Sequence, residues 1–114
     1  MAELTETLRA EGAEHMAKYM RGDWPADDFI ADVTKRFNRR KVAKSHRTPA
    51  QIRASFAVMH GYLGDAYISG LGSRETAWVR WVSYLTLVDE MTPAAARRFA
   101  RHLFRAVDDV APYS

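Results

Sequence analysis

The chain has 114 residues and a mass of 13.0 kDa, enough for one domain with a core of its own and without disulfides or metal ions. Hydrophobic residues make up 47% of it and charged residues 27%, which excludes a disordered or collagen-like chain. The absence of cysteine excludes a disulfide framework, a thiol nucleophile and a cysteine zinc site.

Charge is unevenly distributed along the sequence, although the net charge is only +3. Residues 1–32 contain eight acids and three bases, whereas residues 33–64 contain eight bases and no acid. Residues 65–114 contain six of each. An acidic segment is therefore followed directly by a strongly basic one.

Two features concern the location of the protein. The longest segment without Asp, Glu, Lys or Arg is the eleven residues from Ala54 to Gly64, shorter than the roughly 20 that a membrane-spanning helix requires. The opening segment from Met1 to Glu6 is acidic, whereas a secretory signal begins with basic residues followed by apolar ones. We therefore expect a cytoplasmic protein with no membrane partner.

The first two predicted elements are helices. Apolar or small residues recur at every fourth position from Leu4 to Met16, which predicts a helix over residues 3–20. Pro25 suits the first position of a second helix, and Asp27 and Asp28 suit the positive end of its dipole. The expected buried stripe of this second helix consists of Phe29, Ile30, Val33 and Phe37.

The third predicted helix has the clearest start. Thr48, Pro49 and Gln51 combine a threonine cap, a proline at the first helical position and a glutamine in a capping box. Gly61 and Gly64 interrupt its interior, which predicts the close approach of another backbone. Its expected core face consists of Ile52, Phe56, Met59, Leu63 and Ala66.

Two more helices complete the predicted fold. The fourth, over residues 74–91, is apolar around most of its circumference, which is typical of a central helix. The fifth begins at Pro93 and ends before Pro112. The sequence therefore predicts an all-α fold, a single compact globule of about five helices over residues 1–114, with a short tail at 111–114.

Two cationic segments are the candidate binding residues. The first is a basic tract over residues 35–47, and the second lies in the fifth helix. The segment between the second and third helices is longer than the turn of a helix-turn-helix motif and lacks glycine, so that motif is not predicted. The candidate nucleic-acid-binding residues are Lys35, Arg36, Arg39, Arg40, Lys41, Lys44 and Arg47 in the tract and Arg97, Arg98, Arg101 and Arg105 in the fifth helix.

Such a concentration of like charges favours a polyanionic partner, because binding relieves repulsion and releases counterions. We therefore expect a small accessory or regulatory protein that binds nucleic acid, duplex DNA above all, through phosphate contacts. Reading of bases would require a side chain such as Asn38 or an arginine in the major groove. An ordinary solvated surface that balances the acidic first helix is the alternative interpretation of the basic tract.

A different function class also fits the sequence. A small helical protein of this kind could be a protein-binding module, an adaptor or inhibitor that docks on an acidic or nucleic-acid-binding surface. Trp24 is then the candidate partner-binding residue, and self-association of the acidic first helix with the basic tract of another copy belongs to the same class.

The sequence contains no recognisable catalytic motif. Glu11 and His15 share a helix face, but neither an HExxH pattern nor a Walker pattern occurs, and no nucleophile, base and orienting acid have motif spacing. We therefore expect no catalytic residues, metal or cofactor, and a protein that is not an enzyme.

Overall fold

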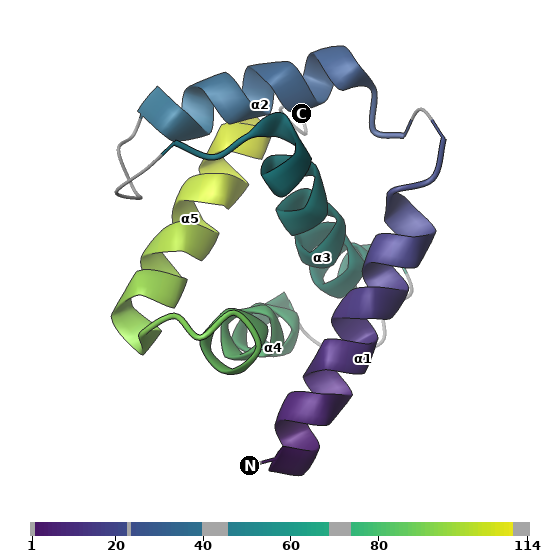
Figure 1. Cartoon of the computed structure of the whole chain (residues 1–114), viewed down its shortest axis with the longest axis vertical. Helices are drawn as coiled ribbons and strands as arrows, with labels where there is room; N and C mark the ends of the chain where they lie inside the picture. Colours follow the sequence, from purple (N-terminus) through teal and green to yellow (C-terminus); the bar gives the residue numbers. More distant parts are fainter. Residues whose placement is uncertain (1, 23, 40–45, 69–73, 111–114) are drawn as a thin grey trace.

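Five α-helices make up the part of the chain that the computed structural model describes, residues 2–22, 24–39, 46–68 and 74–110. No strand occurs in these ranges, so the predicted all-α fold is confirmed. The helices are α1 (Ala2–Tyr19), α2 (Asp27–Arg39), α3 (Pro49–Ile68), α4 (Arg74–Leu87) and α5 (Pro93–Val110) (Figure 1).

The helices pack around α3, which contacts α1, α2 and α4, while α5 contacts α2 and α4. Figure 1 shows α1 and α5 on opposite sides of α3, with α2 lying across one end of the molecule. The radius of gyration of the Cα atoms is 13.5 Å, the value expected for a compact chain of this length.

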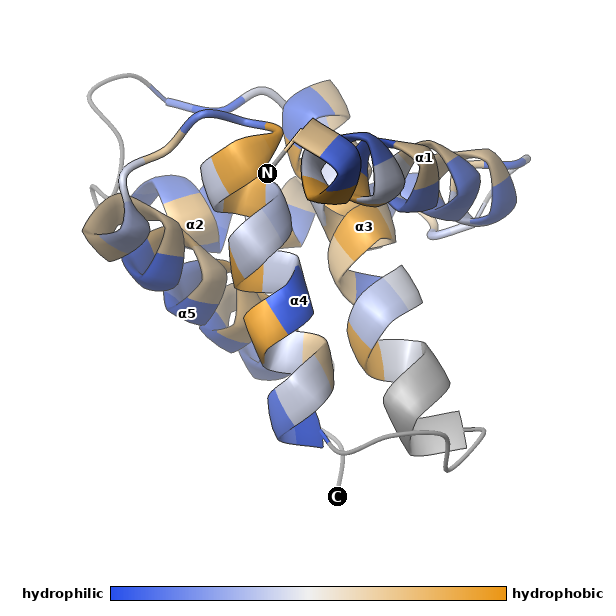
Figure 2. Ribbon diagram, turned by 90° about the horizontal axis from the view of Figure 1, so that it is seen from below, coloured by the Kyte–Doolittle hydropathy of each residue, from blue (hydrophilic) through white to orange (hydrophobic). Residues whose placement is uncertain are grey.

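The contact between α2 and α5 is apolar. Ile30, Val33 and Phe37 are buried on α2, as predicted, and Phe29 is half-buried. The rings of Phe37 and Phe99 meet edge to face with centroids 5.2 Å apart, a favourable geometry for aromatic pairs. Figure 2 shows hydrophilic and hydrophobic residues alternating along both helices, as expected of helices with one polar side.

The predicted start of α3 is confirmed. The backbone N–H of Gln51 donates to Oγ1 of Thr48 over 3.2 Å, and the backbone N–H of Thr48 donates to Oε1 of Gln51 over 2.9 Å. This reciprocal pair is the capping box that the sequence indicated, and it satisfies two donors that the helix end would leave unpaired.

The predicted start of α2 is wrong by two residues. The helix begins at Asp27, while Pro25 lies before it, buried and joined to Trp24 by a cis peptide bond. The guanidinium of Arg53 on α3 donates to the carbonyl oxygen of Pro25 over 2.7 Å and pairs with the Asp27 carboxylate. These contacts attach the beginning of α2 to α3. They join residues far apart in the sequence, so no local pattern predicts them.

The predicted end of α4 is also wrong, because the helix ends at Leu87 instead of continuing to residue 91. Glu90 has a φ of 58°, in the left-handed region, and the N–H of Met91 donates to the carbonyl oxygen of Leu85 over 3.1 Å. A left-handed residue at this position reverses the chain and satisfies a terminal carbonyl group.

The expectation that α4 is the central helix needs correction. Trp81 and Leu85 are buried, but Val79 is 57% exposed, so one side of α4 faces solvent. The middle of α3 is more completely enclosed, with four consecutive buried residues from Phe56 to Met59. The predicted core residues of α3 are confirmed except Ala66, whose side chain lies outside the described part of the structure.

α1 fits against its neighbours through two glycines. A Cβ atom on Gly12 would lie 2.2 Å from Cε2 of Tyr84, and one on Gly61 would lie 2.1 Å from Cγ of His15. The missing side chain at Gly61 therefore leaves room for the ring of His15 on α1. The sequence had predicted the close approach of another backbone at this position. On α1 itself, Leu8 is buried, whereas Leu4 near the start of the helix is 41% exposed.

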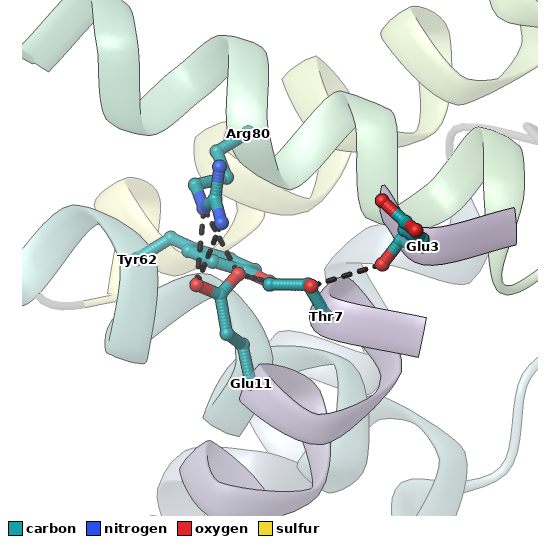
Figure 3. Close-up of polar contacts among 5 residues, drawn as sticks. All are labelled: Glu3, Thr7, Glu11, Tyr62 and Arg80. Carbon is teal, nitrogen blue, oxygen red and sulfur yellow. Dashed lines mark hydrogen bonds and ion pairs between the residues drawn. The ribbon is translucent and has the colours of Figure 1, made fainter. Parts of the chain in front are cut away.

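A polar cluster also attaches α1 to α3 and α4. Figure 3 shows the Glu11 carboxylate reaching from α1 toward Arg80 of α4, beside the ring of Tyr62 of α3. Nη2 of Arg80 lies 2.8 Å from Oε2 of Glu11, its Nε lies 2.9 Å from Oε1, and the Tyr62 hydroxyl donates to Oε1 over 3.0 Å. The cluster joins residues that are 51 and 69 positions apart in the sequence.

The electrostatics of this cluster follow from its contacts. Burial by itself would raise the pKa of Glu11, but the hydrogen bonds from Arg80 and Tyr62 outweigh burial and leave that pKa below its ordinary value. The same carboxylate raises the pKa of the Arg80 guanidinium, mainly through their hydrogen bonds. Both groups are therefore charged at neutral pH and form an ion pair between α1 and α4.

Candidate nucleic-acid interface

Eight of the eleven cations that the sequence singled out lie in the described part of the chain. Arg40, Lys41 and Lys44 lie outside the described residues. The described eight, which we call the cationic corner, are Lys35, Arg36 and Arg39 at the end of α2, Arg47 before α3, and Arg97, Arg98, Arg101 and Arg105 on α5.

The structure brings the two cationic segments together at Phe99. This ring contacts Phe37, two residues before Arg39, and the guanidinium carbon of Arg47 lies 5.3 Å from the centroid of the same ring. Arg98 is the chain neighbour of Phe99 on α5. The end of α2, Arg47 and the first half of α5 therefore meet at one place, which the sequence could not show.

The cations of α5 lie on the side of that helix away from the core. Arg97, Arg101 and Arg105 are exposed, whereas Phe99 and Leu103 between them are buried. Successive members of this row are about 6 Å apart along the helix axis, from a rise of about 1.5 Å per residue. Such a row presents regularly spaced charges along one edge of the molecule.

Asn38, near the end of α2, binds the backbone of Arg47 just before α3. Its Nδ2 donates to the carbonyl oxygen of Arg47 over 2.9 Å, and its Oδ1 accepts from the N–H of Arg47 over 2.9 Å. Both ends of the amide are therefore engaged with the backbone, and Asn38 is not available as the base-reading side chain that the sequence allowed. Its structural role is to fix Arg47 beside the end of α2.

No ion pair among the described residues involves the cations of the corner. The ion pairs in that part of the chain join Arg9 to Glu6, Arg53 to Asp27 and Arg80 to Glu11, and none involves the corner. Burial raises the pKa of Asp89, and the charge of Arg47 opposes that rise. The corner therefore retains a large positive charge available to an anionic partner.

The two phenylalanine rings at the corner are buried. Phe37 and Phe99 are 1% and 3% exposed. Within the described ranges, the exposed large hydrophobic residues all lie elsewhere, and they are Leu4, Met20, Trp24 and Val79. Stacking on bases requires exposed rings, so this surface is suited to phosphates and not to stacked bases.

Trp24, the candidate partner-binding residue, lies at the other end of α2. It is 42% exposed, and its ring lies 5.0 Å from the imidazole of His60 and 5.4 Å from the ring of Tyr19, measured between centroids. Residues 27 and 39 are separated by about 18 Å along the helix axis at about 1.5 Å per residue. Trp24 is therefore distant from the cationic corner.

Sequence reasoning missed the contacts that position these residues. In the sequence Glu11 shares a helix face with His15, and its contact with Arg80 has no local signal. Among the described residues, no group of three or more His, Cys, Asp or Glu side chains could hold a metal ion. No helix in the same part of the chain is long and apolar enough to cross a membrane.

Comparison of this chain with protein-family models, curated proteins and solved structures gives no match in any of the three.

Proposed function

We propose that this protein binds nucleic acid, duplex DNA above all, through phosphate contacts from the cationic corner. The observation that carries the proposal is the meeting of two distant cationic segments at Phe99, with no ion pair to the described acids. Phosphates would relieve the repulsion between these cations, and the release of condensed counterions would favour binding.

The chemistry of the corner supports sequence-independent binding. Seven of its eight side chains are arginine or lysine on exposed positions, and Arg47 is half-buried on Phe99. Asn38 is engaged with the backbone of Arg47, which leaves arginines as the candidates for any contact with a base edge. We therefore propose a non-enzymatic accessory or regulatory role in which the protein recognises the backbone of the duplex.

The experiment that tests this proposal is a salt titration of binding to a random-sequence duplex and to a matched single strand. Each phosphate contact contributes about −0.9 to the slope of log affinity against log salt on duplex DNA. We expect a steep linear slope that corresponds to several contacts, with tighter binding to the duplex. Negligible binding to both nucleic acids at low salt would overturn the proposal.

The second candidate function is a protein-binding module, and the exposure of Trp24 is the observation that favours it. An indole that is 42% exposed while packed on Phe56 and His60 can serve as a rigid apolar anchor for a partner. Self-association belongs to this class and predicts a dimer that salt disperses, because acidic α1 would meet the basic segments of another copy. Light scattering at several salt concentrations tests it, and a monomer at low salt would contradict self-association.

A further inference from the structure

Arg47 differs from the other described cations of the corner. The other seven are exposed at the surface, whereas Arg47 is half-buried. Its guanidinium carbon lies over the ring of Phe99, 5.3 Å from the centroid, a distance at which a cation is attracted to an aromatic face. Phe99 is itself only 3% exposed and packs on Phe37, so the core fixes the surface under the guanidinium.

The backbone of Arg47 is fixed as well. Asn38 donates to its carbonyl oxygen and accepts from its N–H, each over 2.9 Å. The next residue, Thr48, is held by the capping box of α3, in which its N–H donates to Gln51. Contacts within the protein therefore position both the main chain and the side chain of Arg47.

An arginine that is held in this way suits a phosphate better than a mobile one. An exposed arginine loses rotamer freedom when it holds a ligand, and that loss subtracts from the affinity. Arg47 has given up much of this freedom in the folded protein. None of the hydrogen bonds or ion pairs among the described residues engages its guanidinium, which can therefore donate to phosphate oxygens.

We propose that Arg47 anchors one phosphate of the duplex at a fixed position, and that the exposed cations of the corner add contacts around it. The inference rests on the proposed function, because it gives one residue of the same surface the largest share of the binding. A fixed phosphate contact sets the orientation of the duplex on the protein without any contact to a base. Asn38 is then a positioning residue, because it binds the backbone of Arg47 and not the ligand.

Asp89 is the acid that opposes this contact. It is exposed, and the charge of Arg47 acts on its pKa, so the two side chains are close enough to interact. Because its carboxylate repels a phosphate held by Arg47, Asp89→Asn should strengthen duplex binding by about twofold or more. Asp28→Asn makes the same change in net charge at the other end of α2, and we expect it to have a smaller effect. Equal effects of the two variants would contradict a phosphate position beside Arg47.

The main test is the affinity of the full chain for a random-sequence duplex, with Arg47→Gln compared with Arg98→Gln. Both variants remove one positive charge from the corner, so each should lower the salt slope by about 0.9. We expect Arg47→Gln to weaken binding by about tenfold or more, about 1.4 kcal/mol, and Arg98→Gln by about threefold or less. Equal losses of affinity would overturn the anchoring role of Arg47 and leave the corner as the binding surface.

Two variants that keep or leave the charge of Arg47 make the test independent of whether Arg47→Gln folds. Arg47→Lys retains the charge but lacks the planar guanidinium, so we expect an unchanged salt slope and an affinity reduced by about threefold or more. Asn38→Ala retains every cation and releases the backbone of Arg47, so we expect the same pattern. Native affinity in both variants would overturn the inference alone. Failure of the native protein to bind the duplex at low salt would overturn the proposed function, and this inference with it.

Discussion

α2 and α1 are attached to the rest of the molecule by different kinds of contact. α2 packs on α5 through an apolar stripe that includes Val33, Phe37 and Phe99, all nearly inaccessible to solvent. α1 has only Leu8 and Gly12 fully buried and is held by a glycine-dependent fit and the ion pair of Glu11. One interface depends on buried apolar area, and the other depends on exact placement of a few groups.

The difference shows which contacts tolerate substitution. An apolar stripe spreads its stabilisation over many atoms and tolerates changes that preserve volume. A fit in which a Cβ would lie 2.1 Å from a ring atom leaves no room for any other residue without movement of that ring. The predictions below test this contrast, beginning with the interface between α2 and α5.

Phe99→Ala should produce the largest loss of stability, about 3–5 kcal/mol, because it leaves a cavity beneath Phe37 and removes the ring under Arg47. Chemical denaturation measures the loss. Phe104→Ala on the same helix is the matched control and should cost less, because Phe104 is only half-buried. Equal losses of stability in the two variants would show that Phe99 contributes no more to the stability of the fold than Phe104 does.

Gly61→Ala should come next, with a loss of about 1–3 kcal/mol, because the added methyl group would displace the ring of His15. In Gly64→Ala, three residues further along α3, the Cβ atom would lie 3.2 Å from Nε2 of His60, a contact that a shift of a few tenths of an ångström relieves. We expect this control to be neutral or stabilising by up to about 1 kcal/mol through helix propensity. Thermal unfolding of both variants checks the prediction, and a stable Gly61→Ala protein would refute the close fit of α1.

Asn38→Ala should cost about 1–2 kcal/mol, because it removes two hydrogen bonds to the backbone of Arg47. Amide hydrogen exchange at Arg47 should accelerate in this variant. Asn38→Asp keeps the acceptor for that N–H and loses only the donor, so it should protect the same amide better than alanine does. Unchanged exchange in Asn38→Ala would contradict the assignment of Asn38 as a backbone clamp.

Glu11→Gln should have the smallest effect at neutral pH, about 1 kcal/mol or less, because the side chains of Glu11 and Arg80 are 30% and 40% exposed and water screens their pair. The pKa of Glu11 in the folded state lies below its ordinary value of 4.5, so its charge contributes stability above that pH. That contribution is lost as the pH falls through the folded-state pKa.

The stability difference between the native protein and Glu11→Gln should therefore shrink as the pH is lowered from 4.5. Urea denaturation across this range measures it. Glu14→Gln, which removes an exposed acid of the same helix, provides the matched control. A difference that stays constant through the acidic range would contradict the role of the Glu11 charge.

The sequence was sufficient for elements that depend on local pattern. The capping box of Thr48 and Gln51 and the buried stripe of α2 are periodic or short-range features, and the structure confirms them. The contacts of Arg53 with Pro25 and Asp27, the fit of His15 at Gly61 and the exposure of Val79 depend on how the helices pack together. No window of the sequence contains both partners of those contacts, so the predictions there were wrong.

The candidate site, like the fold, was predictable only where it depends on local sequence pattern. Its residue types and their clustering follow from composition, whereas the meeting of residues 37, 47 and 99 requires the fold. The engagement of Asn38 with Arg47 is a contact over nine residues that no local rule predicts. That these residues bind nucleic acid is our central claim.

The most direct measurement of that claim is duplex affinity for two matched double charge reversals. Arg39→Glu with Arg101→Glu changes one residue on each helix of the cationic corner, and Arg9→Glu with Arg21→Glu makes the same change in net charge elsewhere. We predict that the corner variant binds about tenfold or more weakly and that its salt slope falls by about 2, while the other variant retains both nearly intact. Equal losses in the two variants would show that only net charge matters and would contradict the cationic corner as a binding surface.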